Sequence, residues 1–231
     1  MGACAVVPAY NEAARVGGTV EALLDGVVDE VLVVDDGSKD RTAAVAARAG
    51  AHVLRLGTNR GKGGAVNQGL AHVLNTAPHV RWLLLADADL GASARHLAAL
   101  VAAVKSDRAD MAIASFQSRG GFGIVKRTAA RGIRWLTGFH AASPLSGQRA
   151  LTREAAQRLM PLPSGWGMEV GMTVRALWAG LRVVEIDVPL KHRETGRDLS
   201  GFVHRGKQCA AIVSTLCRLG VDRALARGRG Q

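Results

Sequence analysis

The sequence has few cysteines and no long apolar run. Its 231 residues include three cysteines, an odd number without metal-ligand spacing, which argues against a disulfide framework. No window reaches the roughly 18 consecutive apolar residues that a membrane span requires. The N-terminus runs directly into an apolar stretch without a basic leader, so we expect no secretion signal. These absences together predict a cytoplasmic protein.

Aromatic residues and acidic residues are also scarce. Aromatics make up 4% of the chain, which leaves few stacking platforms for single-stranded nucleic acid. The 19 aspartates and glutamates are outnumbered by 30 lysines and arginines, so the formal net charge is +11. This excess favours anionic partners such as nucleotides, phosphorylated metabolites or an anionic membrane surface. Because no nucleic-acid-binding motif is recognisable, we expect no nucleic-acid partner.

What the chain does contain is a regular alternation of apolar runs and helical patterns. In the first half, strands are predicted at 3–7, 31–34, 52–56, 82–86 and 111–114, and helices at 12–24, 42–49, 65–74 and 93–105. Continuous apolar strands separated by helices predict an α/β fold with a mostly parallel sheet covered on both faces. In the second half we expect helices at 122–136, 153–159, 167–178 and 202–225, and a strand within 182–190.

Two aspartates, Asp87 and Asp89, follow the fourth predicted strand and are separated by Ala88. Alternate side chains of an extended chain point to the same side, so the two carboxylates lie together and Ala88 points away. Ionised carboxylates repel each other unless a cation lies between them. Oxygen ligands of this kind suit Mg²⁺ or Mn²⁺, which also bind substrate phosphates. The pair therefore predicts a divalent-metal site, with a solvated turn as the simpler alternative.

Polar segments follow the other predicted strands as well. Pro8 cannot donate to a ladder, so we expect the chain to leave the sheet there, with Asn11 capping the next helix. Of Asp35 and Asp36, one caps a turn and the other is available to a ligand. Glycines around Lys62 open a helix whose free amides favour phosphate, and the lysine adds a charge. In parallel sheets, ligands bind at these carboxyl ends of the strands.

Taken together and in this order, the segments resemble the family 2 glycosyltransferases of the GT-A fold, which is Rossmann-like. The resemblance covers about residues 3–200, and the matching segments are Val7–Glu12, Val33–Ser38, Gly61–Ala65 and Asp87–Asp89. It implies a UDP- or GDP-linked sugar donor, an inverting transfer, and Mg²⁺ or Mn²⁺ bound at Asp87 and Asp89, of which Asp89 is also assigned to catalysis. By the same resemblance, the donor site takes in Pro8, Ala9, Tyr10, Glu12, Val34, Asp36, Lys62, Asp87 and Ala88.

Three later segments resemble the acceptor side of polyprenyl-phosphate sugar synthases and glucosyl-phosphoglycerate synthases. Arg149 is a planar donor suited to phosphate oxygens, or else a surface arginine before the next helix. Glu169 would orient a sugar hydroxyl or act as a base, or it is an ordinary helix-start glutamate. A phosphate acceptor is already ionised and needs no base. His192 would complete the metal sphere, and Arg193 would neutralise the leaving nucleoside diphosphate.

We expect one GT-A domain over residues 1–200, followed by a C-terminal helix and basic tail at 201–231. The domain divides into a nucleotide-sugar half at 1–115 and an acceptor half at 116–200. The terminal helix is amphipathic and basic, so it is able to lie on an anionic membrane as a peripheral contact. Packing on its own domain, or on a second subunit in a homodimer, is the alternative that we favour.

The leading functional prediction is a metal-dependent inverting glycosyltransferase. It moves a hexose from a nucleoside-diphosphate sugar to a phosphorylated acceptor, foremost polyprenyl (dolichyl-type) phosphate at the inner membrane surface. The rival acceptor is a small soluble molecule such as 3-phosphoglycerate, favoured by His192 and by the absence of a membrane-spanning extension. A sugar-phosphate nucleotidyltransferase would need a glycine-rich loop with Arg and Lys where this chain has Pro8–Glu12. A non-enzymatic basic binding protein is the remaining alternative.

Overall fold

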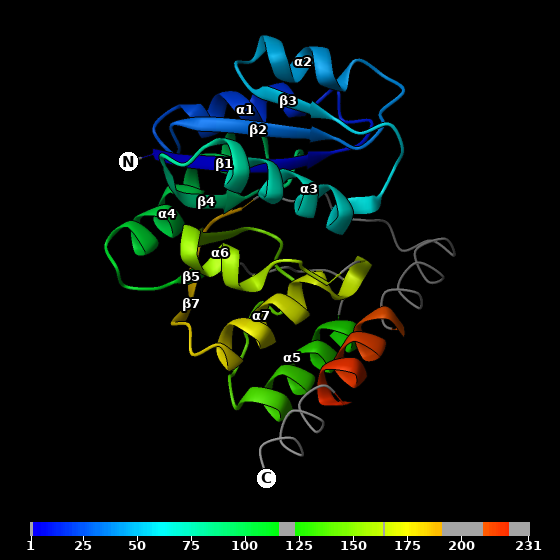
Figure 1. Ribbon diagram of the computed structural model, residues 1–231, viewed down its shortest axis with the longest axis vertical. Coiled ribbons are helices and arrows are strands. Elements are labelled where there is room, and N and C mark those ends of the chain that lie inside the picture. Colours follow the sequence, from blue (N-terminus) through cyan, green and yellow to red (C-terminus); the bar gives the residue numbers. More distant parts are fainter. Residues whose placement is uncertain (1, 116–122, 164, 191–209, 222–231) are drawn as a thin grey trace.

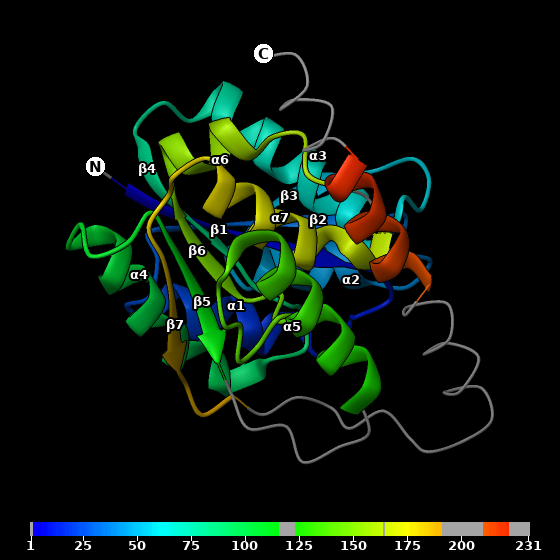
Figure 2. The ribbon, with the colours of Figure 1, turned by 90° about the horizontal axis from the view of Figure 1, so that it is seen from below.

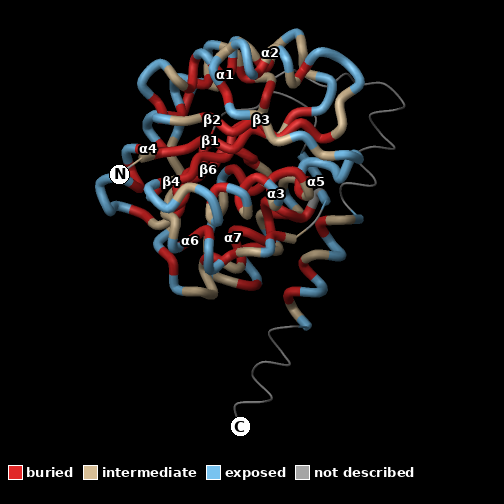
Figure 3. The backbone as a smooth tube through the Cα atoms, turned by 45° about the horizontal axis from the view of Figure 1, so that its top comes forward, coloured by how far each residue is buried: buried red, intermediate tan, exposed pale blue. Residues whose placement is uncertain are grey.

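The computed structural model describes residues 2–115, 123–163, 165–190 and 210–221, which form a layered α/β fold (Figure 1). In this part of the chain one sheet holds seven strands in the order β3-β2-β1-β4-β6-β5-β7. Helices cover both faces of the sheet, and buried residues concentrate along the strands and the inner sides of the helices (Figure 3). The predicted GT-A type of fold, with a mostly parallel sheet flanked by helices, is confirmed.

The strands are β1 (Gly2–Ala9), β2 (Glu30–Asp35), β3 (His52–Arg55), β4 (Val80–Leu85), β5 (Met111–Ser115), β6 (Arg149–Thr152) and β7 (Val183–Asp187). The helices are α1 (Val16–Leu24), α2 (Thr42–Arg48), α3 (Gly61–Thr76), α4 (Ala98–Lys105), α5 (Gly123–Thr137), α6 (Arg153–Leu159) and α7 (Met168–Trp178), with 3-10 segments η1 (Gly91–Leu97) and η2 (Gly165–Gly167). A terminal helix covers 210–221. The helix predicted over 93–105 is thus two elements, η1 and α4.

Pro8 lies inside β1 and pairs with Val34, so the expectation that the chain leaves the sheet at Pro8 is wrong. The carbonyl of Val6 accepts a hydrogen bond on the β4 side of β1, and that of Ala9 accepts one on the β2 side. Because main-chain groups alternate between the two neighbours, Pro8 faces the β4 side, where pairing with β4 has already ended at Val6. The missing proline amide therefore removes no ladder bond.

Helix α1 begins at Val16, later than predicted, and Asn11 does not cap it. Asn11 has a left-handed backbone conformation with φ 56°. The loop after β2 and the first residue of α2 hold this segment instead, because the Asn11 amide donates to Ser38 Oγ (2.9 Å) and the Glu12 amide donates to Thr42 Oγ1 (2.8 Å). These bonds tie the end of β1 to the loop beside it and delay the first helical turn.

Strand β6 was not predicted from the sequence. It has four residues, runs antiparallel to both neighbours, and lies between β4 and β5. A run this short carries no readable period, and the predicted helix at 153–159 directly follows it. Its position matters for the site, because Arg149 at its first residue pairs with Leu85 at the last residue of β4.

Two hydrophobic clusters fill the space between the sheet and its helices. One cluster holds α1, η1 and α4 against one face, and the other holds α3, α6 and α7 against the opposite face. Helix α3 lies very close to the strands, since a side chain at Gly69 would collide with Val6 and Val34. Only glycine permits this approach, which brings the beginning of α3 to the edge where β1 and β2 end.

A third cluster joins α5, α7 and the terminal helix, which lie in the lower part of the molecule in Figure 1 and toward the viewer in Figure 2. Ile212, Leu216 and Leu219 of the terminal helix are buried in it. Side chains placed at Gly132 or Gly167 would overlap the terminal helix, so small residues set the spacing of these helices. Within the described part of the predicted 202–225 helix, packing on its own domain is therefore found. Among the described helices, none is long and apolar enough to cross a membrane.

Candidate functional site

The polar segments that follow β1, β2 and β4 meet at one edge of the sheet. Strand β1 lies between the other two, and Ala9 pairs with Asp35 where β1 and β2 end. The amide of Asp36 donates to the carbonyl of Ala9 (2.8 Å). Asp87 and Asp89 follow directly after β4. The parallel order thus brings segments more than 70 positions apart in the chain together, as in other sheets of this type, where this edge binds ligands.

Tyr10 and Glu12 are the accessible side chains after β1. Tyr10 is 43% exposed. Glu12 Oε2 is 2.7 Å from Nε of Arg15, so this carboxylate is already paired with a cation. Ala9 and Val34 are buried inside their strands and expose almost no side-chain surface at the edge. Their assignment to the donor site stays a prediction. Contact of either residue with the donor would have to be made by main-chain atoms.

Asp35 and Asp36 are both buried and both engaged. Asp35 Oδ1 accepts from the Ser38 amide (3.0 Å), and its other oxygen lies 3.4 Å from Arg55 Nε. Asp36 Oδ1 accepts from the amide of Arg60 (2.7 Å). Through this bond Asp36 holds the loop that leads into α3 and fixes the start of that helix against the end of β2. The bond uses one oxygen of Asp36, so the binding of a ligand by this carboxylate stays a prediction.

The centre of the site is a cluster of one lysine, two carboxylates and one amide. Lys62 Nζ lies 2.7 Å from Asp87 Oδ1 and 3.4 Å from Glu169 Oε1. Gln148 Nε2 donates to Asp87 Oδ2 at 2.5 Å. The four residues come from the first turn of α3, the end of β4, the segment before β6 and the first turn of α7. The predicted phosphate-side lysine, donor-side aspartate and acceptor-side glutamate are thus in direct contact.

The electrostatics of this cluster keep Lys62 charged. Partial burial of the ammonium disfavours its charge, but the carboxylates of Asp87 and Glu169 outweigh that effect and raise the pKa of Lys62 above its ordinary value. Among the described members of the cluster, one positive charge faces two negative charges. The site therefore holds a fixed cation and retains negative charge that a further cation would neutralise.

Gly147 is what allows Lys62 to reach Asp87. A Cβ atom at position 147 would collide with Nζ of Lys62 and lie 3.5 Å from Asp87 Oδ1. No residue other than glycine leaves this space open. Gly147 and Gln148 belong to a segment singled out from the sequence only for Arg149. Their own roles were missed, because neither a small residue nor a neutral amide signals an ion-pair site by itself.

Asp89 is half-buried, and Ala88 beside it packs its methyl group into the core, although both residues lie in a turn rather than in an extended strand. Both oxygens of Asp87 already accept interactions, so Asp89 is the carboxylate better placed to ligate a divalent ion. Within the described ranges, no group of three or more His, Cys, Asp or Glu side chains converges. This donor set fits an ion that keeps waters and binds phosphate, as Mg²⁺ and Mn²⁺ do. His192 and Arg193 lie outside the described residues.

Thr19, on α1, fixes the backbone of the aspartate pair. Its Oγ1 donates to the carbonyl of Ala88 (2.9 Å) and accepts from the amide of Gly91 (2.8 Å). Thr19 is fully buried, so these two bonds replace water for all three groups. Sequence reasoning missed this residue, although a hydroxyl on the otherwise apolar inner face of α1 was a usable signal.

Arg149 is fully buried at the start of β6, so the alternative of a surface arginine is wrong. Its Nε donates to the carbonyl of Ser146 (3.0 Å), and Nη1 donates to Thr173 Oγ1 (2.9 Å). Nη2 has no partner among the described residues. Burial lowers the pKa of Arg149 to about 10, while Glu169 and Glu185 act in the opposite direction. The guanidinium thus supports the first turns of α7, which carry Glu169; phosphate binding by Arg149 stays a prediction.

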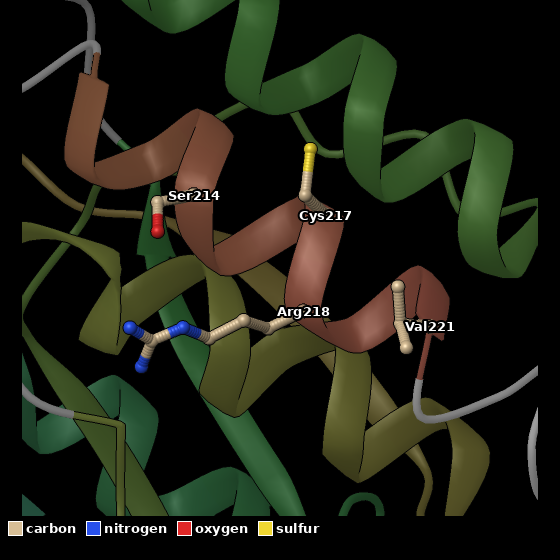
Figure 4. A pocket seen from close by; sticks show the side chains of 4 residues that line it. All are labelled: Ser214, Cys217, Arg218 and Val221. Atoms are coloured by element: carbon tan, nitrogen blue, oxygen red, sulfur yellow. The ribbon is translucent and has the colours of Figure 1, made fainter.

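Two surface hollows lie away from this edge. One, of about 360 Å³, is lined by four side chains that all project from the terminal helix, namely Ser214, Cys217, Arg218 and Val221 (Figure 4). The other, of about 340 Å³, lies between α5 and the segment after it, and is lined by Ala130, Arg131, Arg134, His140, Ala141 and Ala142. Neither includes a residue predicted for the donor or metal site.

Comparisons with known proteins agree with this geometry. The model of the family "Glycosyl transferase family 2" matches residues 4–158. The chain is 32% identical to an undecaprenyl-phosphate mannosyltransferase of Micrococcus luteus, over 86% of this chain and 87% of that protein. It is 30% identical to a polyprenol monophosphomannose synthase of Mycolicibacterium smegmatis, over 83% and 78%. It spans about two thirds of the length of some other curated relatives.

Among solved structures, the chain resembles glucosyl-3-phosphoglycerate synthase from Mycobacterium tuberculosis. A crystal structure of that enzyme with Mn²⁺, UDP-glucose and phosphoglyceric acid aligns with a TM-score of 0.75 and 26% identity, over 94% of this chain and 79% of the other. The match includes the sheet edge described above and extends well beyond the segments that first suggested the family. The chain therefore belongs to glycosyl transferase family 2, and it is a glycosyltransferase.

Proposed function

We propose that this enzyme transfers a hexose from a nucleoside-diphosphate sugar to polyprenyl phosphate, with inversion at the anomeric carbon and with a divalent ion. The observation that carries the proposal is the contact of Lys62 with both Asp87 and Glu169, next to Asp89. This arrangement joins a diphosphate-binding cation to the carboxylates of the donor side and the acceptor side. A site of this composition suits a reaction whose leaving group and acceptor are both anionic.

On the donor side, Tyr10 and Glu12 flank the nucleoside, and Asp87 and Asp89 face the diphosphate. Asp89 would hold Mg²⁺ or Mn²⁺, with His192 as the second proposed ligand. When bound, the ion supplies positive charge at the leaving diphosphate. Lys62 supplies a second charge from the protein itself, held in place by its two carboxylate partners. Arg193 is the third cation that we assign to the leaving group.

On the acceptor side, a phosphate oxygen attacks the anomeric carbon. The bond from that carbon to the diphosphate oxygen breaks, and its electron pair leaves with the nucleoside diphosphate. The acceptor phosphate is already ionised, so no proton has to be removed. Glu169, held 3.4 Å from Lys62, then serves to orient a sugar hydroxyl rather than to abstract a proton. We assign Arg149 to positioning Glu169 on this side, because its guanidinium is fully buried and donates to Thr173 in α7.

A second acceptor deserves equal testing, because the structural relative was crystallised with phosphoglyceric acid. The two sequence relatives named above act, by their names, on undecaprenyl and polyprenol substrates. A lipid acceptor would place the reaction at the cytoplasmic membrane surface. The two acceptors give products that separate cleanly, since a glycosylated polyprenyl phosphate partitions into butanol and glycosyl phosphoglycerate stays in water.

The test begins with donor binding. UDP-, GDP- and dTDP-sugars are each added with Mn²⁺, Mg²⁺ or a chelator, and the unfolding temperature is measured. A ligand at 100 times its dissociation constant adds about 2.7 kcal/mol of stability, which is readily detected. We expect one nucleotide to stabilise the protein, and to do so only with metal. The identified donor, carrying a radiolabelled sugar, is then offered polyprenyl phosphate or 3-phosphoglycerate. Absence of any metal-dependent shift would overturn the proposal in favour of a non-enzymatic binding protein.

A further inference from the structure

Helix α5 has an amphipathic pattern with an unusual outer side. Its inner face is buried in the third cluster through Val125, Ala129, Ile133 and Leu136. Its exposed side carries two large apolar residues, Ile124 (71% exposed) and Trp135 (79% exposed). Three arginines lie between them on the same side at helical spacing. We call these five residues the α5 outer face: Ile124, Arg127, Arg131, Arg134 and Trp135.

The charge of this helix is of one sign. Lys126 and three arginines lie within 123–137, and no aspartate or glutamate occurs there. Within the part of the chain that the structure describes, none of these four cations takes part in an ion pair. Arginines that have no ion pair in this part of the chain, and that lie between two exposed apolar side chains, are suited to a partner that is both anionic and apolar.

The hollow beside α5 adds a site for a single anionic group. Arg131, Arg134 and His140 line its 340 Å³ together with three alanines. Glu185 contacts the wall of this hollow, but its two oxygens accept from the amides of Ala142 (2.7 Å) and Ser143 (2.8 Å). That carboxylate is therefore occupied by the main chain. The arginines and the histidine are left to face an incoming anion such as a phosphate.

The position of α5 makes its outer face accessible. Helix α5 and the terminal helix form one end of the long axis of the molecule, opposite α2 (Figures 1 and 2). The terminal helix uses its apolar face to pack on α5 and α7. Its outward side adds Val213 and Val221, which are 42% and 57% exposed. Trp135 lies next to Gly220, so the two helices present one continuous surface.

We propose that the α5 outer face docks this enzyme on an anionic lipid bilayer. Ile124 and Trp135 enter the headgroup region, and a lipid phosphate occupies the hollow of Arg131, Arg134 and His140. This inference rests on the proposed lipid-phosphate acceptor, and it places a membrane contact on α5 rather than on the terminal helix, for which packing on its own domain was the favoured prediction. Tryptophan favours the membrane interface, and each arginine near an anionic surface contributes to binding.

A bilayer accounts for the composition of this face better than a second copy of the chain does. A symmetric dimer through α5 would bring the arginines of two copies together without carboxylates on the same helix to pair with them. An anionic lipid surface instead meets every arginine with a phosphate. The bulky apolar residues at both ends of the row then enter the same layer, as in helices that lie in the plane of a membrane.

The experiment is flotation of the full chain with phosphatidylcholine vesicles, with or without phosphatidylglycerol. We expect binding to the anionic vesicles and little binding to the neutral ones. The double variant Arg131→Gln, Arg134→Gln should bind about 25-fold more weakly, from about fivefold per arginine. The matched control is Arg41→Gln, Arg48→Gln at α2, which removes the same charge from the opposite end and should bind as wild type. Equal loss in both variants, or equal binding to neutral vesicles, would overturn the proposal.

Trp135 supplies a second readout. Its fluorescence should shift to shorter wavelength on anionic vesicles, and Trp135→Phe should lose that shift. Sedimentation of the free protein tests the competing occupant, because a dimer that Trp135→Phe dissociates would overturn the bilayer proposal. The donor-induced thermal shift should be unchanged in the arginine double variant. Failure of the wild-type protein to bind anionic vesicles, with its donor shift intact, therefore counts against the docking surface alone, whereas absence of the donor shift in wild type counts against the proposed function.

Discussion

The strands on the two sides of β4 bring residues to the site in opposite ways. In β3-β2-β1-β4 all pairs are parallel, so each strand contributes the residues that follow it. Strand β6 is antiparallel to β4, so its beginning rather than its end lies at the same edge. Gln148, the residue before β6, and Arg149, its first residue, therefore lie at the site. The rule that site residues follow strands therefore applies to β1, β2, β3 and β4 but does not predict Gln148 or Arg149.

This comparison implies that the two sides make different contributions, the parallel side providing charge and the β6 side providing position. Asp89→Asn tests the first statement and should have the largest effect. We expect transfer to fall by at least about 100-fold, because the carboxylate that we propose as a ligand of the divalent ion at the diphosphate loses its charge. Nucleoside diphosphate release measures this effect, and the unfolding temperature should stay near that of wild type.

Asp25→Asn is the matched control, since Asp25 is an exposed aspartate paired only with Arg95 in the described structure and lies far from the edge. It should transfer at the wild-type rate. If Asp89→Asn transferred at the wild-type rate, the statement that the parallel side contributes charge to transfer would be wrong.

Gly147→Ala tests the positional role of the β6 side and should have the second-largest effect. The added methyl group occupies the space of the Lys62 ammonium and forces it away from Asp87. We expect donor affinity and transfer to fall by about tenfold, equivalent to about 1.4 kcal/mol. Donor titration and initial rates measure this loss.

Gly18→Ala is a control in α1, where a Cβ meets nothing within 4 Å. It should be neutral or stabilise the protein by up to about 1 kcal/mol, because alanine favours the helix. If the two alanine variants transfer equally well, the contact between Lys62 and Asp87 has no part in donor binding.

Thr19→Val tests whether the parallel side also depends on positioning, here of the main chain around Asp87 and Asp89. Valine keeps the shape of threonine but leaves the Ala88 carbonyl and the Gly91 amide without partners. We expect a loss of about 1 to 3 kcal/mol in unfolding free energy, measured by urea denaturation. Thr76→Val on the exposed side of α3 should cost far less. Equal costs would mean that water replaces the lost bonds at Thr19.

The smallest effect is expected at the far end of the sheet, where Arg182 joins the segments before β5 and β7. Its guanidinium hydrogen-bonds Asp110 and lowers the pKa of that carboxyl below its ordinary value. Stability from a lowered pKa is present above the unfolded value of about 3.9 and is lost as pH falls through the folded value. Arg182→Met should therefore lower the unfolding temperature by roughly 2 °C at pH 7 and not in acid. A difference that persists in acid would contradict the ion-pair explanation.

The sequence predicted the parallel side well, because buried parallel strands are continuous apolar runs and the polar residues of the edge follow them directly. Asp87, Lys62 and Glu169 were each identified before their contact was known. The predictions failed where a residue's role depends on a distant partner. Nothing local distinguishes Arg149 in a buried strand from Arg149 on a surface, and Pro8 reads as a strand stop until the end of the β1–β4 pairing is known.

The insertion of β6 between β4 and β5 also has a consequence for synthesis on the ribosome. Until residue 152 has emerged, one edge of β4 (VRWLLL) has no strand to pair with, since β5 pairs only with β6 and β7 in the described sheet. An unpaired apolar edge recruits other chains. We expect a fragment of residues 1–115 to aggregate when it is expressed alone, and co-expression of the remainder to rescue it. Residues 1–115 would then depend on the rest of the chain for their solubility during synthesis.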